Sequence, residues 1–267
     1  MTTLSSAVDL LVPTSVAEAV EAFGDGAGVT VLGGGTILTP EISQGRLAPG
    51  RTLLLTRAGM AGVSGDGTLT IGAMTPVAAL ADGTPEPLAS AARNVGDPEI
   101  RAQATLGGNL CAPAGGLEAP RGDLAAPLVA LAARVRSAGA GGERTEAVED
   151  FLAAPEGRLV LAVEVDPPRA GAWVAQRRRH THAYTLLGVA AAETADGVRI
   201  AAAHAGARAA RLVSVEAALA GGAAPAEAAA AALDDVEPHD DALASAWYRA
   251  RILPVLVARA IDQLRGA

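Results

Sequence analysis

Residues Val31–Pro40 read VLGGGTILTP, which places three consecutive glycines directly after a short β-branched run. The run Gly28–Leu32 predicts a strand, and the glycines predict a tight turn at its end. Because glycine has no side chain, main-chain N–H groups in such a turn can approach a phosphate closely, and the hydroxyl of Thr36 adds another donor. The turn therefore suits a pyrophosphate, although an ordinary tight turn remains the alternative.

The spacing of these glycines argues against two other kinds of nucleotide site. The G-x-G-x-x-G pattern with a helix directly after it is absent, and so is the lysine of a P-loop. A second small-residue turn, Thr105–Asn109 (TLGGN), lies much further along the chain, flanked by a hydroxyl and an amide. The two turns could close on one ligand, or they could be unrelated.

Periodicity predicts helices and strands around the two turns. Apolar residues at helical spacing mark Ser15–Phe23, where Ser15 can cap the helix and Glu18 follows three residues later. Further helices are expected at Pro76–Ala81, Pro87–Val95, Val213–Ala220 and Asp241–Arg265, and further strands at Arg51–Leu55, Thr68–Ile71 and Arg158–Val165. The regular long crossover of a doubly wound sheet is not visible.

Other segments carry weaker signals. Gly96–Cys111 has little periodicity and is expected to be a structured loop, and Leu124–Val135 is expected to be a buried strand or helix. Ala183–Glu193 and Gly197–Ala203 suggest strands packed on helices, and Gly221–Ala232 (GGAAPAEAAAAA) is either a mobile link or the exposed start of a helix. In the closing helix Pro254 marks an expected kink, and the apolar residues at helical spacing are Leu243, Trp247, Ile252, Val255, Leu256 and Ile261.

Length and composition restrict the class of protein. Half of the 267 residues are hydrophobic, which suffices for one large or two medium domains with their own cores. The net charge of −8 argues against nucleic acid as a partner, because binding to phosphate backbones needs an excess of basic residues. Cys111 is the only cysteine, so any metal cofactor is expected on another chain. No apolar stretch is long enough for a membrane span and the first residues lack the positive flank of a secretory signal, so the expected location is cytoplasmic.

Four segments together resemble the FAD-binding, medium subunit of the molybdenum hydroxylases, the family of carbon monoxide dehydrogenase and xanthine dehydrogenase. Leu32–Pro40 (LGGGTILTP) is similar to the first flavin loop of that subunit, and Asp97–Cys111 (DPEIRAQATLGGNLC) is similar to the second. Ile71–Thr75 (IGAMT) resembles a characteristic strand, and Trp247–Ala260 (WYRARILPVLVARA) resembles the closing helix. The segments occur in the order of the family and extend over almost the whole chain.

The resemblance implies an α+β fold with two domains. A two-lobed FAD-binding domain of the vanillyl-alcohol-oxidase/PCMH type is expected over residues 1–166, split near residue 57. A smaller α/β domain of the carbon monoxide dehydrogenase flavoprotein C-terminal type is expected over residues 167–267. The boundary is expected at the double proline Pro167-Pro168, which follows the strand predicted at Arg158–Val165.

The resemblance also implies where non-covalent FAD would bind. The first loop would carry the pyrophosphate, the second would add further contacts, and Asp123 resembles the family aspartate on the adenosine side, where a carboxylate suits ribose hydroxyls. A solvated loop aspartate is the alternative for Asp123. The expected cofactor-binding residues are Val31, Leu32, Gly33, Gly34, Gly35, Thr36, Ile37, Leu38, Thr105, Gly108, Asn109, Cys111 and Asp123. No catalytic acid–base pair and no metal site are expected in this chain.

The chain departs from the family pattern in three places. The segment Ala112–Pro120 makes the stretch before Asp123 about five residues longer than usual, while Val174 stands where Lys is expected and His182 where Asp is expected. A lysine near the flavin would favour its anionic reduced form, so the electron acceptor could differ from the usual one. The arginines of Arg177–Arg179 could contact phosphate or a neighbouring subunit, or form a solvated surface. His180 and His182 lack an evident third metal ligand.

The function implied by the resemblance is electron transfer. Electrons from a molybdenum site would arrive through iron–sulfur clusters on a partner subunit and leave through FAD to NAD, oxygen or a quinone. The expected partners are a large molybdenum-cofactor subunit and a small subunit with [2Fe-2S] clusters, in a heterotrimer. A free-standing flavin oxidoreductase of the same superfamily and a scaffold subunit that has lost flavin are the alternatives.

Overall fold

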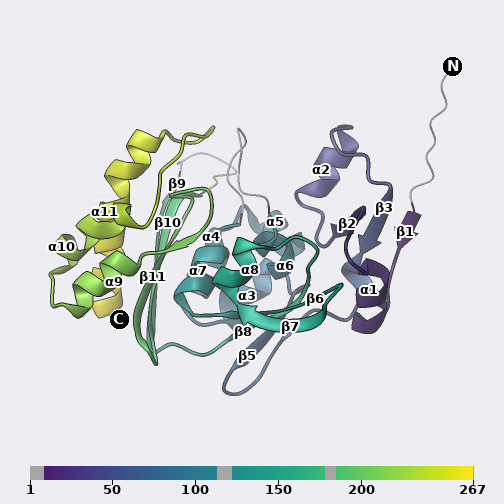
Figure 1. The fold of residues 1–267 in the computed structure, drawn as a ribbon, viewed down its shortest axis with the longest axis horizontal. Helices are drawn as coiled ribbons and strands as arrows, with labels where there is room; N and C mark the ends of the chain where they lie inside the picture. The colour runs from purple at the N-terminus through teal and green to yellow at the C-terminus, as the bar shows by residue number, and fades with distance from the viewer. Residues whose placement is uncertain (1–8, 113–121, 178–184, 267) are drawn as a thin grey trace.

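A computed structural model describes residues 9–112, 122–177 and 185–266. Within these ranges the strands form three sheets, which follow one another across the molecule from the N-terminal to the C-terminal part of the chain (Figure 1). Helices lie between the sheets and around them. This mixed architecture confirms the expected α+β class.

The first sheet is parallel, in the order β1–β3–β2. Its elements are β1 (Asp9–Leu11), α1 (Val16–Phe23), β2 (Val29–Leu32), α2 (Leu38–Ser43), β3 (Arg51–Leu54) and the 3-10 turn η1 (Leu55–Arg57). Ser15 caps α1 by accepting a hydrogen bond from the Glu18 N–H at 3.2 Å, and the Glu18 carboxylate accepts one from the Thr14 N–H at 2.7 Å. The expected first helix and both expected strands are confirmed, and the three-glycine turn follows β2 directly.

The second sheet is antiparallel, in the order β4–β5–β8–β6–β7. Its strands are β4 (Val63–Ser64), β5 (Leu69–Gly72), β6 (Arg134–Gly139), β7 (Gly142–Ala147) and β8 (Leu159–Val165). The helices of this part are α3 (Val77–Gly83), α4 (Leu88–Asn94), α5 (Pro98–Gln103), α6 (Leu106–Leu110), α7 (Ala125–Ala130) and α8 (Val148–Ala153). β8 is the middle strand and is buried almost throughout, which explains its nearly unbroken apolar sequence. The segment Leu124–Val135, left open between strand and helix, contains α7 and the start of β6.

The expectation of a loop over Gly96–Cys111 is wrong, because two short helices occupy most of it. α5 begins after Asp97, whose carboxylate accepts a hydrogen bond from the Ile100 N–H at 2.8 Å, with Pro98 at the first helical position. α6 begins after Thr105, which caps it in the same way. Helices of five or six residues are too short to show an apolar period, although their capping residues are visible in the sequence.

The C-terminal sheet is antiparallel, in the order β12–β11–β10–β9. Its elements are β9 (Ala170–Arg177), β10 (Thr185–Thr194), β11 (Gly197–Ala203), β12 (Ala210–Arg211), α9 (Val213–Ala220), α10 (Pro225–Ala229), the 3-10 helix η2 (Ala230–Asp234) and α11 (Ala246–Arg265). α7 packs against β10 and β11 on one face, and α11 packs against β9 and β10 on the other (Figure 1). Alternate residues of β10 therefore enter two different cores: Ala190 lies on the side of the second sheet and Ala191 on the side of α11. The expected strands packed on helices are confirmed.

The alanine-rich segment Gly221–Ala232 is the largely exposed start of a helix, one of its two expected forms, and is not a mobile link. It forms α10 and the start of η2, and Ala228, Ala229 and Ala232 are buried in the core beside α11. These alanines are packing residues, since a small side chain lets neighbouring helices approach closely. The segment is therefore exposed on one side and packed against the core beside α11 on the other.

The closing helix also corrects two expectations. It begins at Ala246, five residues after the expected start, and Trp247 (67% exposed) and Val255 face outward although both were placed on its apolar side. The buried side instead includes Arg249, whose Nη2 lies 2.6 Å from Oδ2 of Asp241, with both side chains fully buried. A buried ion pair carries no hydrophobic signal, so the apolar period alone assigned the wrong face. None of the helices in the described ranges has the length and apolar character needed to cross a bilayer.

Candidate functional site

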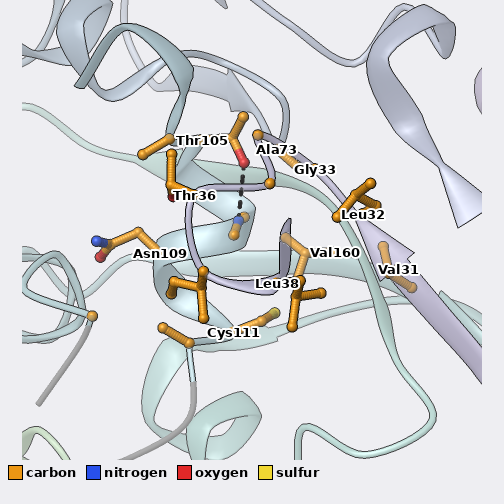
Figure 2. A pocket seen from close by; sticks show the side chains of 18 of the residues that line it. Val31, Leu32, Gly33, Thr36, Leu38, Ala73, Thr105, Asn109, Cys111 and Val160 are labelled. Carbon is orange, nitrogen blue, oxygen red and sulfur yellow. Dashed lines mark hydrogen bonds between the residues drawn. The ribbon is translucent and has the colours of Figure 1, made fainter. Parts of the chain in front are cut away.

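A cavity of about 600 Å³ lies where the turn after β2 meets α5, α6 and β8 (Figure 2). This volume falls within the range of roughly 300–1,000 Å³ that is usual for cofactor and ligand sites. Every cofactor-binding residue expected from the sequence lines it: Val31, Leu32, Gly33, Gly34, Gly35, Thr36, Ile37, Leu38, Thr105, Gly108, Asn109, Cys111 and Asp123. The structure thus brings together segments that are more than sixty residues apart in the chain.

The first loop, defined here as residues 33–36, lines the cavity along its whole length. Gly35 has a φ of +72°, a conformation that glycine adopts without strain, and its carbonyl accepts a hydrogen bond from the Thr39 N–H at 2.9 Å. Among the described residues, no acceptor is found for the N–H groups of Gly34, Gly35 and Thr36. Successive unpaired N–H groups in a turn of this kind form a concave site for an anion.

The first loop lies against Gln103 at the end of α5 and against Thr105 of the second loop, and these contacts explain the glycines at its start. A Cβ atom on Gly34 would lie 1.8 Å from the carbonyl oxygen of Gln103, and one on Gly33 would lie 3.0 Å from Oγ1 of Thr105. The first distance is far below any van der Waals contact and involves main chain, which cannot move away as a side-chain end can. Glycine is therefore required at position 34 by close approach, while its neighbours Gly33 and Gly35 allow the turn.

The second loop, defined here as residues 105–109, is held by hydrogen bonds of its own. The Gly108 N–H donates to Thr105 Oγ1 at 3.1 Å, the bond drawn as a dashed line in Figure 2. The N–H groups of Leu106 and Gly107 donate to the carbonyls of Thr75 and Ala73, at 3.0 and 2.8 Å. The N–H groups of Leu106, Gly107 and Gly108 are thus satisfied within the protein. The segment Ile71–Thr75 acts as its support, which gives a structural reason for that stretch of sequence.

Asn109 and Asp123 are linked to one another through the second loop. The Leu124 N–H donates to Oδ1 of Asn109 at 3.0 Å, which fixes the turn containing Asp123 against α6. Oδ1 of Asp123 lies 2.7 Å from Nε2 of His204, a residue just beyond the end of β11. Asp123 is buried and lines the cavity, so it is not the solvated loop aspartate that the sequence left as the alternative.

Cys111 closes the second loop as the C-cap of α6. Its side chain is accessible from the cavity, yet protein surrounds most of it, and this burial raises the pKa of the thiol to about 11. The thiol is therefore protonated at neutral pH and is a weak nucleophile. It serves the cavity as a small apolar wall.

Several lining residues were not expected from the sequence. Met74 and Val160 add apolar surface, and Arg158 brings a cation whose Nη2 donates to the carbonyl of Ser137 at 2.9 Å. Burial lowers the pKa of Arg158, and the nearby Arg144 acts in the same direction. These residues lie on β8 or beside it and on the segment after β5, so only sheet pairing brings them to the cavity. For these residues, the sequence contained one indication of a place at the site: Met74 belongs to the segment Ile71–Thr75, which resembles the family.

The positions where the chain departs from the family pattern are only partly described. Val174 lies on β9 and packs against the core beside α11, and it does not line the cavity. Its placement makes it a packing residue and gives no support to a charge effect on the flavin. Residues 113–120, Arg178, Arg179, His180 and His182 lie outside the described ranges. Within those ranges, no group of three His, Cys, Asp or Glu side chains could hold a metal ion.

One known family matches a stretch of the chain that includes all residues lining the cavity. Residues 6–168 match the family described as "FAD binding domain in molybdopterin dehydrogenase". The match includes both loops, Asp123 and the first two of the three sheets. It extends over more than half of the chain.

Solved structures are similar to this chain over almost its whole length. One is a carbon monoxide dehydrogenase from Hydrogenophaga pseudoflava that lacks the Mo-pyranopterin moiety of the molybdenum cofactor, with 27% identity, a TM-score of 0.84 and 97% of each chain covered. Reconstituted CO dehydrogenase from Oligotropha carboxidovorans matches at 24% identity and a TM-score of 0.85, over 97% of this chain and 98% of that one. Quinoline 2-oxidoreductase from Pseudomonas putida 86 matches at 23% identity and a TM-score of 0.79, over 98% of both. The last two similarities, below 25% identity, show a shared fold.

Proposed function

The chain belongs to the family of FAD-binding domains of molybdopterin dehydrogenases, and from that premise we propose that it is the electron-transfer subunit of a molybdenum hydroxylase complex. Its cofactor is FAD and its class is oxidoreductase. In the proposed role, electrons arrive from iron–sulfur clusters on a partner subunit and leave to an external acceptor. The acceptor is NAD, oxygen or a quinone, and the substrate of the complex binds elsewhere.

The observation that carries the proposal is the set of unpaired N–H groups in the first loop. Gly34, Gly35 and Thr36 have no main-chain acceptor among the described residues, and all three line the cavity. Buried or partly buried N–H groups normally have partners, so three successive exceptions need an explanation. A pyrophosphate in the cavity would supply acceptors to all of them.

The remaining contacts follow from chemistry and position. We assign the pyrophosphate to Gly33–Thr36 and the apolar walls to Val31, Leu32, Ile37 and Leu38. Thr105, Gly108, Asn109 and Cys111 form the second side, and Asp123 receives the ribose hydroxyls. No residue of the chain is assigned an acid–base role.

When bound, FAD supplies redox chemistry that accepts and gives up electrons singly or in pairs. The chain's own contribution is to bind the cofactor without a covalent bond, to orient it and to exclude water. Cys111 offers no covalent attachment, because its raised pKa keeps the thiol protonated.

The larger assembly and its layout remain part of the proposal. The solved relatives are carbon monoxide and quinoline oxidising enzymes, which supports a large molybdenum-cofactor subunit and a small [2Fe-2S] subunit as partners in a heterotrimer, with the cytoplasm as its location. We propose a two-lobed FAD-binding domain over residues 1–166, split near residue 57, and a second domain over 167–267. The separate first, second and C-terminal sheets support this division.

Reconstitution and co-purification test the proposal. The full chain, freed of flavin, should take up added FAD and gain the absorption bands of a bound flavin. It should also co-purify with a large molybdenum subunit and a small iron–sulfur subunit. A chain that binds no FAD would instead be the scaffold subunit, and one that turns over a substrate alone would be the free-standing oxidoreductase.

A further inference from the structure

A buried pair of side chains joins the C-terminal sheet to the cavity. Nε2 of His204 lies 2.7 Å from Oδ1 of Asp123, and both residues are 8% exposed. Asp123 precedes α7 in the second lobe, and His204 follows β11 of the C-terminal sheet, 81 positions later. Because Asp123 lines the cavity, this contact places a residue of the C-terminal region directly behind a cavity residue.

The chemistry of the pair assigns the donor. A carboxylate only accepts, so the N–H is on Nε2 of His204 and donates to Oδ1. For Oδ2, the second carboxylate oxygen, no hydrogen-bond partner occurs in the described part of the chain. The pair therefore engages one oxygen of Asp123 and leaves the other available for a ligand in the cavity.

The backbone of His204 adds a second, independent sign. Its φ is +61°, in the left-handed region that residues other than glycine seldom adopt. Such strain costs of order 1–3 kcal/mol and persists where the surrounding structure holds it. A glycine would suit this backbone better, and the hydrogen bond to Asp123 gives a physical reason for histidine at this position.

A neighbouring contact also joins the C-terminal sheet to the second sheet's helices, but it does not reach the cavity. Arg199 on β11 donates from Nη2 to the Val129 carbonyl at 2.9 Å and also pairs with Glu149. Arg199 reaches across the same junction but does not line the cavity, and its partners do not either. His204 differs because its partner is a cavity residue.

We infer that His204 is a positioning residue for the cofactor: it holds Asp123 so that Oδ2 meets the adenosine ribose of FAD. The inference rests on the proposed function, and it makes the C-terminal region a contributor to flavin affinity. The FAD site is thus completed by a side chain that lies outside the matched residues 6–168. Removing the imidazole should weaken FAD binding through Asp123 and not through loss of the fold.

The test measures FAD and FMN dissociation constants of the full chain by flavin fluorescence. His204→Gly removes the imidazole while relieving the backbone strain, and we expect FAD affinity to fall about tenfold, the effect of one hydrogen bond to a charged group. FMN lacks the adenosine, so its affinity should stay within about twofold of wild type. His204→Asn, which keeps an N–H donor and tolerates a positive φ, should recover part of the loss.

Two further variants distinguish a positioning role of His204 from a role in stabilising the fold alone. In an Asp123→Ala background, His204→Gly should cause no further loss of FAD affinity, because the effect acts through Asp123. Arg199→Gln, the matched control, should lower the melting temperature and leave FAD affinity unchanged.

Equal losses for FAD and FMN, additive losses with Asp123→Ala, or an equal loss in Arg199→Gln would overturn the inference. Failure of the wild-type chain to bind FAD would overturn the proposed function instead.

Discussion

The two loops of the cavity carry similar sequences, GGGT and TLGGN, but they use their main-chain N–H groups differently. In the first loop the N–H groups of Gly34, Gly35 and Thr36 have no main-chain acceptor within the described ranges. In the second, those of Leu106, Gly107 and Gly108 all donate to protein oxygens. Adjacent glycines thus have two distinct uses here. The first loop keeps its main-chain donors free for a ligand, and the second loop uses its donors to hold its own conformation.

The glycines are also required for different reasons. A Cβ on Gly34 would collide with the Gln103 carbonyl at 1.8 Å, whereas one on Gly107 would meet Cβ of Ala73 at 3.0 Å. The first contact joins the first loop to the end of α5, and the second joins the second loop to its supporting segment Ile71–Thr75. Substitutions in the first loop should therefore mainly lower flavin affinity, and substitutions in the second loop should mainly lower the stability of the fold.

Gly34→Ala should have the largest effect on flavin binding. The added methyl group forces the first loop away from Gln103 and misplaces its donors, so FAD affinity should fall about a hundredfold or more. The measurement is FAD titration of the flavin-free chain. Gly50→Ala is the matched control, because its Cβ meets nothing within 4 Å, and it should bind like wild type. Normal affinity in Gly34→Ala would contradict the role given to the first loop.

Thr36→Val should have the next largest effect. Its hydroxyl has no partner among the described residues and lines the cavity, so a bond to the charged pyrophosphate would be lost. FAD affinity should fall about tenfold, while the melting temperature without flavin stays within about 1 °C of wild type. A drop in melting temperature with unchanged affinity would assign Thr36 to the support, reversing the comparison.

Thr105→Val should show the opposite balance. It removes the cap of α6 and leaves the Gly108 N–H unpaired, which costs about 1 kcal/mol of stability. FAD affinity should fall only about threefold, because the second loop gives few donors to the ligand. Calorimetry and FAD titration separate the two effects. Thr105→Ser, which keeps the hydroxyl, should restore the melting temperature.

Cys111 should have the smallest effect on flavin affinity. Cys111→Ala should change it less than about twofold, because the thiol contributes apolar surface alone. Since the pKa of the thiol rises from 9.0 to about 11, its thiolate fraction at pH 8 is about a hundredfold lower than that of an ordinary cysteine. Alkylation by iodoacetamide should be slow at pH 8, accelerate about tenfold per pH unit up to pH 10, and slow further with FAD bound. Rapid alkylation at pH 8 would contradict this environment.

Much of the fold was predictable, because local patterns reflect local structure. The Ser15 cap, the β-branched run before Gly33 and the apolar run of β8 each identified an element correctly. The failures have specific causes. α5 and α6 are too short for a helical period, and the outward face of α11 was misassigned because Arg249 is buried against Asp241.

The sequence by itself determined the family resemblance, the strand-and-turn character of the first loop and part of the set of residues that line the cavity. These follow from short-range rules and from motifs that keep their order along the chain. Only the tertiary structure decided which N–H groups remain unpaired, since the partners of the second loop lie on Ile71–Thr75. It alone joined His204 to Asp123, because a hydrogen bond across 81 residues depends on how two sheets pack and leaves no local pattern.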